Sequence, residues 1–322
     1  HWLLAWLGLE LNTLSILPVI MKPNHPRSTE ATTKYFLIQT TAATMLLLAG
    51  TLNTLQTGQW SITHSMSPPA TTIATVALML KLGLAPIHLW YPDVLQGSTM
   101  NTALLLSTWQ KIAPITLLVM MSNHLPHNTL LSLGLLSALV GGWLGLNQTQ
   151  TRKLLAASSI AHMGWLITAL TISPTLMTLT LLTYIMMTTT VFTYMNTMKT
   201  KTLSDISTTW THSPALLLTT MLALASLGGL PPMTGFMPKW LILKDMMLAE
   251  LTPIALTLLL ASLPSLFFYL RMMYLSALTT PPATTNTEHK WRLKTHLQKN
   301  LVPLMTLTTL ILPLTPVLYN TT

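Results

Sequence analysis

The sequence contains no cysteine and carries very little charge. With no cysteine among its 322 residues, disulfides, thiolate metal sites and iron–sulfur clusters are excluded. Only 7% of the residues are charged, whereas a soluble domain carries about 25%. Hydrophobic residues make up 50% and the mean hydropathy is +0.54, and much of the rest is threonine, which can bond its own helix backbone. These values predict a polytopic membrane protein built as one continuous bundle.

Acidic residues are especially scarce: 7 Asp and Glu stand against 16 Lys and Arg, which gives a formal net charge of +9. Nucleic-acid-binding proteins share such an excess, but here the basic residues are scattered through short loops without interleaved aromatic side chains. The sequence therefore indicates no nucleic-acid partner. It also has no metal-ligand spacing, phosphate-binding loop or nucleophile elbow.

The N-terminus begins abruptly. His1 opens directly into an apolar run, without a methionine or a polar lead-in. A signal peptide would have a charged region before that run and a cleavage site after it, and neither is present. We expect the sequence to be truncated at its N-terminus.

Ten segments approach the ~20 residues that a helix needs to cross a bilayer. Short loops separate them and hold most of the charged residues. We expect transmembrane helices at Trp2–Met21, Tyr35–Gln56, Ala70–Trp90, Thr102–Ser122, Thr129–Asn147, Leu154–Ile172, Thr175–Met198, Pro214–Met247, Thr252–Leu275 and Asn300–Tyr319.

The loop charges agree with this assignment. If each segment crosses once, alternate loops lie on opposite sides of the membrane. On one side, the loops then contain a single basic residue, Lys244, together with the acidic residues Asp245 and Glu250. The positive-inside rule places the other, basic side in the compartment where the chain was made. That side receives Lys22, Arg27, Lys34, Arg152, Lys153, Lys199, Lys201, Arg271, Lys290, Arg292, Lys294 and Lys299.

Two segments cannot be continuous helices. The stretch VALMLKLGLAPIHLWYPD, from Val76 to Asp93, holds Lys81 and then Pro86, which lacks a backbone donor and clashes with the preceding turn. Pro214–Met247 is too long for one span and contains LGGLPPMTGFMPKW, whose glycines and paired prolines interrupt a helix. Irregular backbone is tolerated at membrane depth only where it lines a cavity or packs inside protein. Both breaks are therefore candidate functional sites.

The two breaks lie roughly five spans apart, an odd number, so the helices that carry them run in opposite directions. Secondary transporters place their sites at such paired, interrupted helices. We expect an all-α polytopic membrane protein with about ten transmembrane helices, two of them discontinuous and arranged as antiporter-like inverted repeats. The first repeat covers about 1–122, the second about 129–276, and a C-terminal helix about 300–319.

Four charged residues fall inside predicted spans: Glu10 and the lysines Lys81, Lys111 and Lys239. A charge at the centre of a bilayer helix costs about 2.5–3.5 kcal/mol, so each of them is a candidate functional residue. All three cations are lysine, which can release its proton when desolvated, whereas the arginine guanidinium stays protonated. This choice favours proton exchange over a fixed counter-charge.

Glu10 and Lys81 have two interpretations. They could lie close enough to interact, directly or through one water, because each is otherwise an unpaired charge in an apolar span. Separating such a pair would let the lysine shed its proton. The simpler interpretation is that Glu10 reaches the membrane surface or is satisfied by a nearby serine or threonine.

Lys111 and two histidines also have simpler interpretations beside the functional one. Lys111 either exchanges a proton or packs against a backbone carbonyl freed by Pro114. His88 and His162 are candidate relay groups, although a lone membrane histidine is often only hydrogen-bonded.

Six stretches together resemble a known family: HWLLAWLGLELN, RSTEATTKYFLIQ, KLGLAPIHLWYPDVLQG, TWQKIAP, GGWLGLNQTQTRKLLAASSIAHMGW and GGLPPMTGFMPKW. In these, and over essentially all 322 residues, the chain resembles the chain 2 family of NADH–ubiquinone oxidoreductase. Its members are mitochondrially encoded, antiporter-like subunits of respiratory complex I. The family resembles sodium/proton antiporter subunits, with inverted repeats that each hold a broken helix. It normally has a further N-terminal transmembrane helix, in line with the expected truncation.

The resemblance implies a role for each candidate residue in proton transfer. Glu10 and Lys81 match the glutamate–lysine pair of the first half-channel. Lys111 matches the central lysine that connects the two halves, and Lys239 matches the lysine on the second broken helix.

Further implications concern the relay, the cofactors and the partners. His88 and His162 match histidines along the hydrated axis. The implied activity is proton translocation or charge relay, coupled to electron transfer from NADH to ubiquinone. This chain would hold no cofactor, because NADH, FMN, iron–sulfur clusters and ubiquinone bind other subunits.

Its partners would be membrane-arm and accessory subunits of complex I, and membrane lipids including cardiolipin. It would span the mitochondrial inner membrane, with its basic loops facing the matrix.

Two rival functions are compatible with the same pattern. One is a stand-alone cation/proton antiporter, which would purify outside any NADH-oxidising assembly. The other is a proton-inactive scaffold within the membrane arm. The set of Glu10, Lys81, Lys111 and Lys239 argues against a scaffold, which has no need of desolvated charges.

Overall fold

The computed structural model describes residues 1–63, 66–207, 209, 214–278, 301–310 and 312–314. Apart from one isolated bridge, between Gln150 and Thr202, the regular structure in these ranges is helical. The first half contains α1 (Trp2–Met21), α2 (Pro26–Thr57), α3 (Pro68–Leu82), α4 (Trp90–Gly97), α5 (Met100–Ser107), α6 (Trp109–Met120) and the 3₁₀ turn η1 (Ser122–His124). The second half contains α7 (His127–Gly145), α8 (Thr151–Ile172), α9 (Pro174–Thr197), α10 (Leu203–Ser207), α11 (Pro214–Gly228), α12 (Phe236–Leu248), α13 (Thr252–Leu278), α14 (Leu301–Leu310) and the 3₁₀ turn η4 (Leu312–Leu314).

The expected all-helical membrane architecture is confirmed. Seven helices in the described ranges are long and apolar enough to cross a membrane, with Met100–Met120 counted as one. The shorter apolar helices Pro68–Leu82 and Leu216–Gly228 belong to the two predicted breaks. The exact number of ten spans is not established, and the last expected span, Asn300–Tyr319, lies partly outside the described residues.

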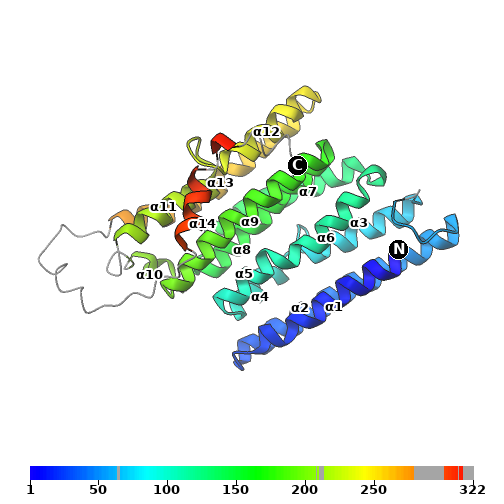
Figure 1. The fold of residues 1–322 in the computed structure, drawn as a ribbon, viewed down its shortest axis with the longest axis horizontal. Coiled ribbons are helices and arrows are strands. Elements are labelled where there is room, and N and C mark those ends of the chain that lie inside the picture. Colours follow the sequence, from blue (N-terminus) through cyan, green and yellow to red (C-terminus); the bar gives the residue numbers. More distant parts are fainter. Residues whose placement is uncertain (64–65, 208, 210–213, 279–300, 311, 315–322) are drawn as a thin grey trace, which may run out of the picture.

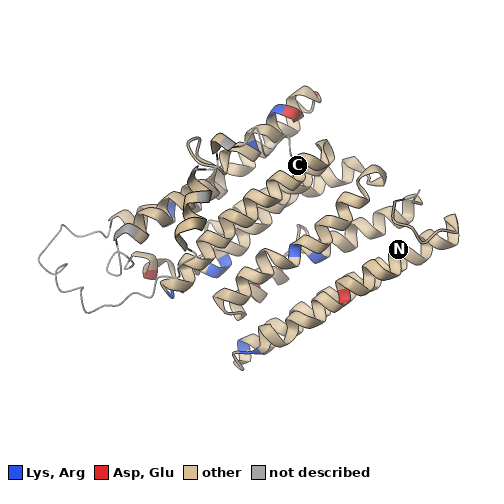
Figure 2. Cartoon of the chain, in the orientation of Figure 1, with Lys and Arg blue, Asp and Glu red and all other residues tan. Residues whose placement is uncertain are grey.

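The helices lie side by side and reverse direction along the chain (Figure 1). α1 and α2 form one edge of the bundle, α7 to α9 its middle, and α11 to α14 the other edge. Figure 2 shows lysine and arginine gathered at the end where α1 ends and α2 and α8 begin, while α12 carries charges of both signs at the opposite end. The asymmetry expected from the loops therefore appears in the described helices; Lys290, Arg292, Lys294 and Lys299 lie outside them.

Helix α2 begins at Pro26, well before the predicted start at Tyr35. The reason is local capping: the His25 side chain accepts a hydrogen bond from the Arg27 N–H at 3.3 Å, and Ser28 Oγ accepts one from the His25 N–H at 3.1 Å. Pro26 stands at the first helical position, where its missing N–H costs nothing. The polar turns at this end are therefore helical although they are not apolar.

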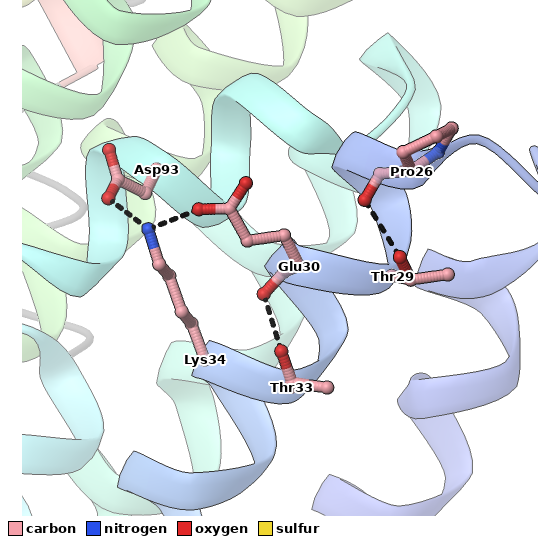
Figure 3. A network of polar contacts seen from close by, with 6 residues as sticks. All are labelled: Pro26, Thr29, Glu30, Thr33, Lys34 and Asp93. Carbon is pink, nitrogen blue, oxygen red and sulfur yellow. Dashed lines mark hydrogen bonds and ion pairs between the residues drawn. The ribbon is translucent and has the colours of Figure 1, made fainter.

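An ion-pair cluster joins α2 to α4 at the basic end of the bundle (Figure 3). Lys34 Nζ lies 2.7 Å from Glu30 Oε1, one turn before it, and 2.8 Å from Asp93 Oδ2 on α4. Partly exposed pairs of this kind add little stability and weaken with salt. The Lys34–Asp93 pair is one contact between α2 and α4, the helix that follows the first break.

Helix α8 lies at the centre of the bundle. Its residues Met163 to Leu170 are all buried, a run longer than two turns, so this part of α8 has no face toward lipid. Glycines let α7 pack very close to it, as is usual where small residues line a membrane helix interface. A Cβ at Gly141 on α7, for example, would lie 2.5 Å from the Ala161 nitrogen.

The predicted span Thr102–Ser122 corresponds to Met100–Met120, in which α5 and α6 form two helical pieces. It is interrupted at Thr108, where φ is −114° and ψ is −69°. The Lys111 N–H bonds to the Thr108 carbonyl at 3.3 Å, three residues back, instead of to Ser107, four residues back. The Ser107 carbonyl is thereby released from the helix, a few residues before Pro114.

Candidate functional site

The first predicted break is present, and glycine makes it possible. Helix α3 ends at Leu82, and Gly83 follows with φ +72°, a conformation that other residues adopt at a cost. The Leu84 N–H bonds to the Met79 carbonyl at 3.1 Å and the Gly83 N–H to the Leu80 carbonyl at 3.2 Å, which is a Schellman cap. Lys81 therefore stands in the last turn, where the partial negative charge of the helix end favours a cation.

The second predicted break repeats this geometry. Helix α11 ends at Gly228, and Gly229 follows with φ +81°. The Leu230 N–H bonds to the Ala225 carbonyl at 3.2 Å, as in the first cap. Lys239, from α12 beyond the break, donates from Nζ to the Gly228 carbonyl at 3.1 Å. Both interrupted helices thus present a carboxyl-terminal end to a lysine.

Gly229 provides a test of how this cap positions Lys239. A Cβ there would lie 3.0 Å from Lys239 Nζ and 3.2 Å from its Cδ, in addition to the strain of a positive φ. Gly58, at the end of α2, has a φ of +73° and open space around the same position. We expect Gly58→Ala to cost only the backbone strain, about 1–2 kcal/mol.

Gly229→Ala should introduce the same backbone strain and should also push the Lys239 side chain away from the Gly228 carbonyl. Proton pumping per assembled subunit should therefore fall in Gly229→Ala and not in Gly58→Ala, when both are measured in membranes with assembly quantified. Equal pumping by the two variants would contradict this role of the cap.

Glu10 and Lys81 are both drawn into the bundle but do not form a direct ion pair. Lys81 is 7% exposed, and its Nζ has no hydrogen-bond partner among the described residues. The Glu10 Oε2 atom is likewise buried and unpartnered in that part of the chain. The ion pairs within 4.0 Å between described residues involve Lys34 instead. A bridge through one water between Glu10 and Lys81 stays a prediction.

A narrow cavity connects Lys81 with Lys111. Both side chains line it, together with Tyr91, Gln39 and Gln110. About 20 Å³ of it is open to the centres of water molecules, which is room for about one water. Tyr91 Oη and Lys81 Nζ are buried there without a partner in the described chain. Since buried polar groups are normally hydrogen-bonded, this first cavity is suited to hold water.

Lys111, on α6, is buried and contacts Tyr184 on α9. It is 3% exposed, and its Nζ donates to the Tyr184 hydroxyl at 3.1 Å. The same Nζ lies 5.0 Å from the ring centre of Tyr91 and 5.1 Å from that of Tyr184, within the range of cation–π attraction. Tyr184 in turn donates to the freed Ser107 carbonyl at 3.1 Å. Lys111 is thus held by a hydroxyl and two rings, and not by a carbonyl that Pro114 frees.

A second cavity lies on the far side of Tyr184. Its lining includes Tyr184, His162, Trp165 and Lys239, and about 20 Å³ of it is open to water centres. The rings of His162 and Tyr184 are 5.7 Å apart at a tilt of 46°. His162 Nε2 lies 3.5 Å from the Tyr269 hydroxyl. Lys239 Nζ lies 5.9 Å above the Trp165 ring.

The structure brings most of the predicted residues together and leaves two apart. Lys81 and Lys111 share the first cavity, and His162 and Lys239 share the second. His88 and Glu10 line neither of these cavities. His88 Nδ1 contacts the Pro86 carbonyl, two residues before it, at 3.1 Å, which agrees with the simpler interpretation of that histidine.

Sequence reasoning missed the tyrosines. Tyr184, Tyr91 and Tyr269 surround Lys111 and His162, and each lies in an apolar segment where it reads as an ordinary core residue. A hydroxyl in an apolar span is a weak signal, because membrane helices here contain many threonines that bond their own backbone, such as Thr188 to the Tyr184 carbonyl. No group of three or more His, Asp or Glu side chains that could hold a metal ion occurs in the described ranges.

Comparisons with known proteins agree with this architecture. The family model described as "NADH:quinone oxidoreductase/Mrp antiporter, TM" matches residues 1–267, and the model described as "NADH dehydrogenase subunit 2 C-terminus" matches residues 266–319. The NADH-ubiquinone oxidoreductase chain 2 of Carassius auratus is 52% identical over 323 residues, which cover 100% of this chain and 93% of the relative. The protein of the same name from Gallus gallus is 49% identical over 318 residues, covering 99% and 92%.

Solved structures give the same picture. A chain of respiratory complex I from Thermus thermophilus superposes with a TM-score of 0.87 at 28% identity, covering 99% of this chain and 75% of that one. A chain of the Mrp complex from Dietzia sp. superposes with a TM-score of 0.82 at 15% identity, covering 98% and 71%, and at that identity it shows the fold alone. From the two family models and the relatives near 50% identity, the chain belongs to the antiporter-like chain 2 family of NADH–ubiquinone oxidoreductase.

Proposed function

We propose that this chain is a membrane subunit of respiratory complex I that moves protons through Lys81, Lys111 and Lys239 while NADH reduces ubiquinone. The observation that carries the proposal is the pair of cavities that meet at Lys111 and Tyr184, each of which also reaches a lysine at a helix break. Family membership indicates the reaction, which is proton translocation coupled to NADH oxidation by ubiquinone. The two cavities indicate a route for protons through this chain.

The residue types suit proton exchange. Lysine can be neutral or charged in a desolvated site, whereas arginine stays charged. Lys81 on the first side and Lys239 on the second each stand at the carboxyl-terminal end of an interrupted helix, whose dipole favours the charged form. Burial favours the neutral form, so small changes in hydration can shift the balance between the two.

The surroundings of the chain follow from the same proposal. Its partners are other membrane and accessory subunits of complex I, and lipids such as cardiolipin cover its outer face. The end of the bundle rich in lysine and arginine faces the mitochondrial matrix. The redox groups, namely FMN, the iron–sulfur clusters and ubiquinone, bind elsewhere in the complex, and this chain contributes proton transfer alone.

A comparison of two lysines on α12 tests the proposal. Lys239→Met removes the lysine of the second cavity, while Lys244→Met makes the same change at an exposed position on the same helix. We expect Lys239→Met to lower the number of protons translocated per NADH oxidised by assembled enzyme in liposomes. Lys244→Met should leave that number unchanged.

Each possible result separates the competing functions. Normal proton stoichiometry in the Lys239→Met enzyme would favour a proton-inactive scaffold. Purification of the chain as a monomer that exchanges cations for protons, outside any NADH-oxidising assembly, would favour a stand-alone antiporter.

A further inference from the structure

Tyr184, from the middle of α9, separates the two cavities. It is 2% exposed, and it lines the second cavity with His162 and Lys239. Its hydroxyl accepts a hydrogen bond from Lys111 Nζ, a side chain that lines the first cavity. Among the described residues, Tyr184 is therefore the side chain that touches the central lysine and also lines the cavity beyond it.

The Tyr184 hydroxyl can accept a proton from Lys111 and donate its own proton toward the second cavity. A tyrosine O–H can accept one hydrogen bond and donate another at the same time. Here it accepts from Lys111 Nζ at 3.1 Å and donates to the Ser107 carbonyl at 3.1 Å. Tyr91 presents only its ring to Lys111, and its own hydroxyl has no partner in the described part of the chain.

We propose that Tyr184 is a catalytic residue whose hydroxyl passes the proton between Lys111 and the second cavity. This proposal rests on the proposed function and names the group that joins its two halves. Tyr184 and His162 both line the second cavity, with their ring centres 5.7 Å apart, and its volume of about 20 Å³ has room for about one water to relay the proton to the imidazole.

The transfer conserves protons and charge. An N–H bond of the Lys111 ammonium breaks, and its proton binds to Tyr184 Oη. The original O–H bond of Tyr184 breaks, and that proton passes through a water to the unprotonated ring nitrogen of a neutral His162. The products are a neutral lysine, an unchanged tyrosine and an imidazolium. Reversal of the same steps recharges Lys111.

The Ser107 carbonyl keeps this route closed in the present arrangement. It holds the hydroxyl proton of Tyr184 at 3.1 Å, but it cannot accept that proton and pass it on. The O–H bond must therefore rotate away from Ser107 and toward the second cavity before transfer. The Ser107 carbonyl is free to accept this hydrogen bond because the helix is interrupted at Thr108. The irregular turn therefore holds the Tyr184 hydroxyl in the orientation that does not transfer the proton.

Tyr184→Phe tests the proposal, since it removes the hydroxyl and keeps the ring. In assembled enzyme in liposomes, we expect protons translocated per NADH to fall to the level of Lys111→Met. Tyr194→Phe is the matched control: Tyr194 lies on the same helix, is 1% exposed, and its hydroxyl has no partner among the described residues. That variant should pump normally.

A second variant separates proton transfer from simple support of Lys111. Tyr184→Gln keeps an acceptor for Lys111 and a donor for Ser107, but an amide does not readily exchange one proton for another. It should assemble and lose pumping as Tyr184→Phe does. Normal pumping by either variant, while Lys111→Met fails, would overturn the role of Tyr184 and leave the proposed function standing.

The remaining outcomes are also decisive. Normal pumping by Lys111→Met would refute the proposed function itself. Failure of both Tyr184 variants to assemble, when Tyr194→Phe assembles, would assign Tyr184 a structural role and would overturn the proposal as well.

Discussion

Lys111→Arg is expected to assemble and to translocate no protons through this subunit. The substitution preserves the positive charge that lies near Tyr91 and Tyr184, but a guanidinium does not release its proton. Among the described residues, no carboxylate lies within 4.0 Å of Lys111, so no ion pair keeps this lysine permanently charged. If the role of Lys111 is to take up and release a proton, retaining the charge cannot rescue it.

Lys111→Met and Lys244→Arg complete this experiment. Methionine roughly preserves volume and removes both charge and exchange, so it should fail as arginine does. Lys244 is exposed on α12, and its replacement by arginine should change nothing. Pumping is measured in liposomes after assembly has been verified. Near-normal pumping by Lys111→Arg together with failure of Lys111→Met would show that a fixed charge suffices.

Gly164→Ala is expected to impair assembly strongly. Gly164 lies on α8 against α7, and a Cβ there would lie 2.6 Å from the Gly134 carbonyl oxygen and 2.7 Å from the Ala138 nitrogen. These are backbone atoms, so the two helices must move apart. Overpacking of a well-packed interior typically costs about 1–3 kcal/mol, and His162 stands on the same helix two residues away.

Gly8→Ala is the control for helix propensity. Gly8 also lies within a helix, α1, but an added Cβ meets nothing within 4 Å. We expect this change to be neutral, or stabilising by up to about 0.5–1 kcal/mol. The amount of each variant in the assembled complex, and its thermal stability in detergent, measure the difference. Equal assembly of Gly164→Ala and Gly8→Ala would contradict the close contact of α7 and α8.

The helix breaks could be predicted because their cause is local. Gly83 and Gly229 supply positive φ angles, and the prolines that follow cannot continue a helix. The lysines of the site were likewise visible, because a charge in an apolar span stands out from its neighbours. In both cases the signal and its consequence lie within a few residues of each other.

The connection between Lys111 and Tyr184 could not be predicted, because its causes are distant. It depends on the rotation of α9 against α6 and on a carbonyl at Ser107 that an irregular turn releases. Neither leaves a periodic pattern in the sequence. The missing direct contact of Glu10 with Lys81 has the same origin, since opposite charges on two helices indicate attraction but not the distance between them.

Lys239 is held by a backbone carbonyl, and this choice of partner has a consequence for turnover. A lysine paired with a carboxylate would leave a buried negative charge behind each time it lost its proton. The Gly228 carbonyl carries no net charge and needs only a donor, which a neutral amine still offers. The contact can therefore persist in both protonation states, so that charge can come and go at this position while the geometry around it stays in place.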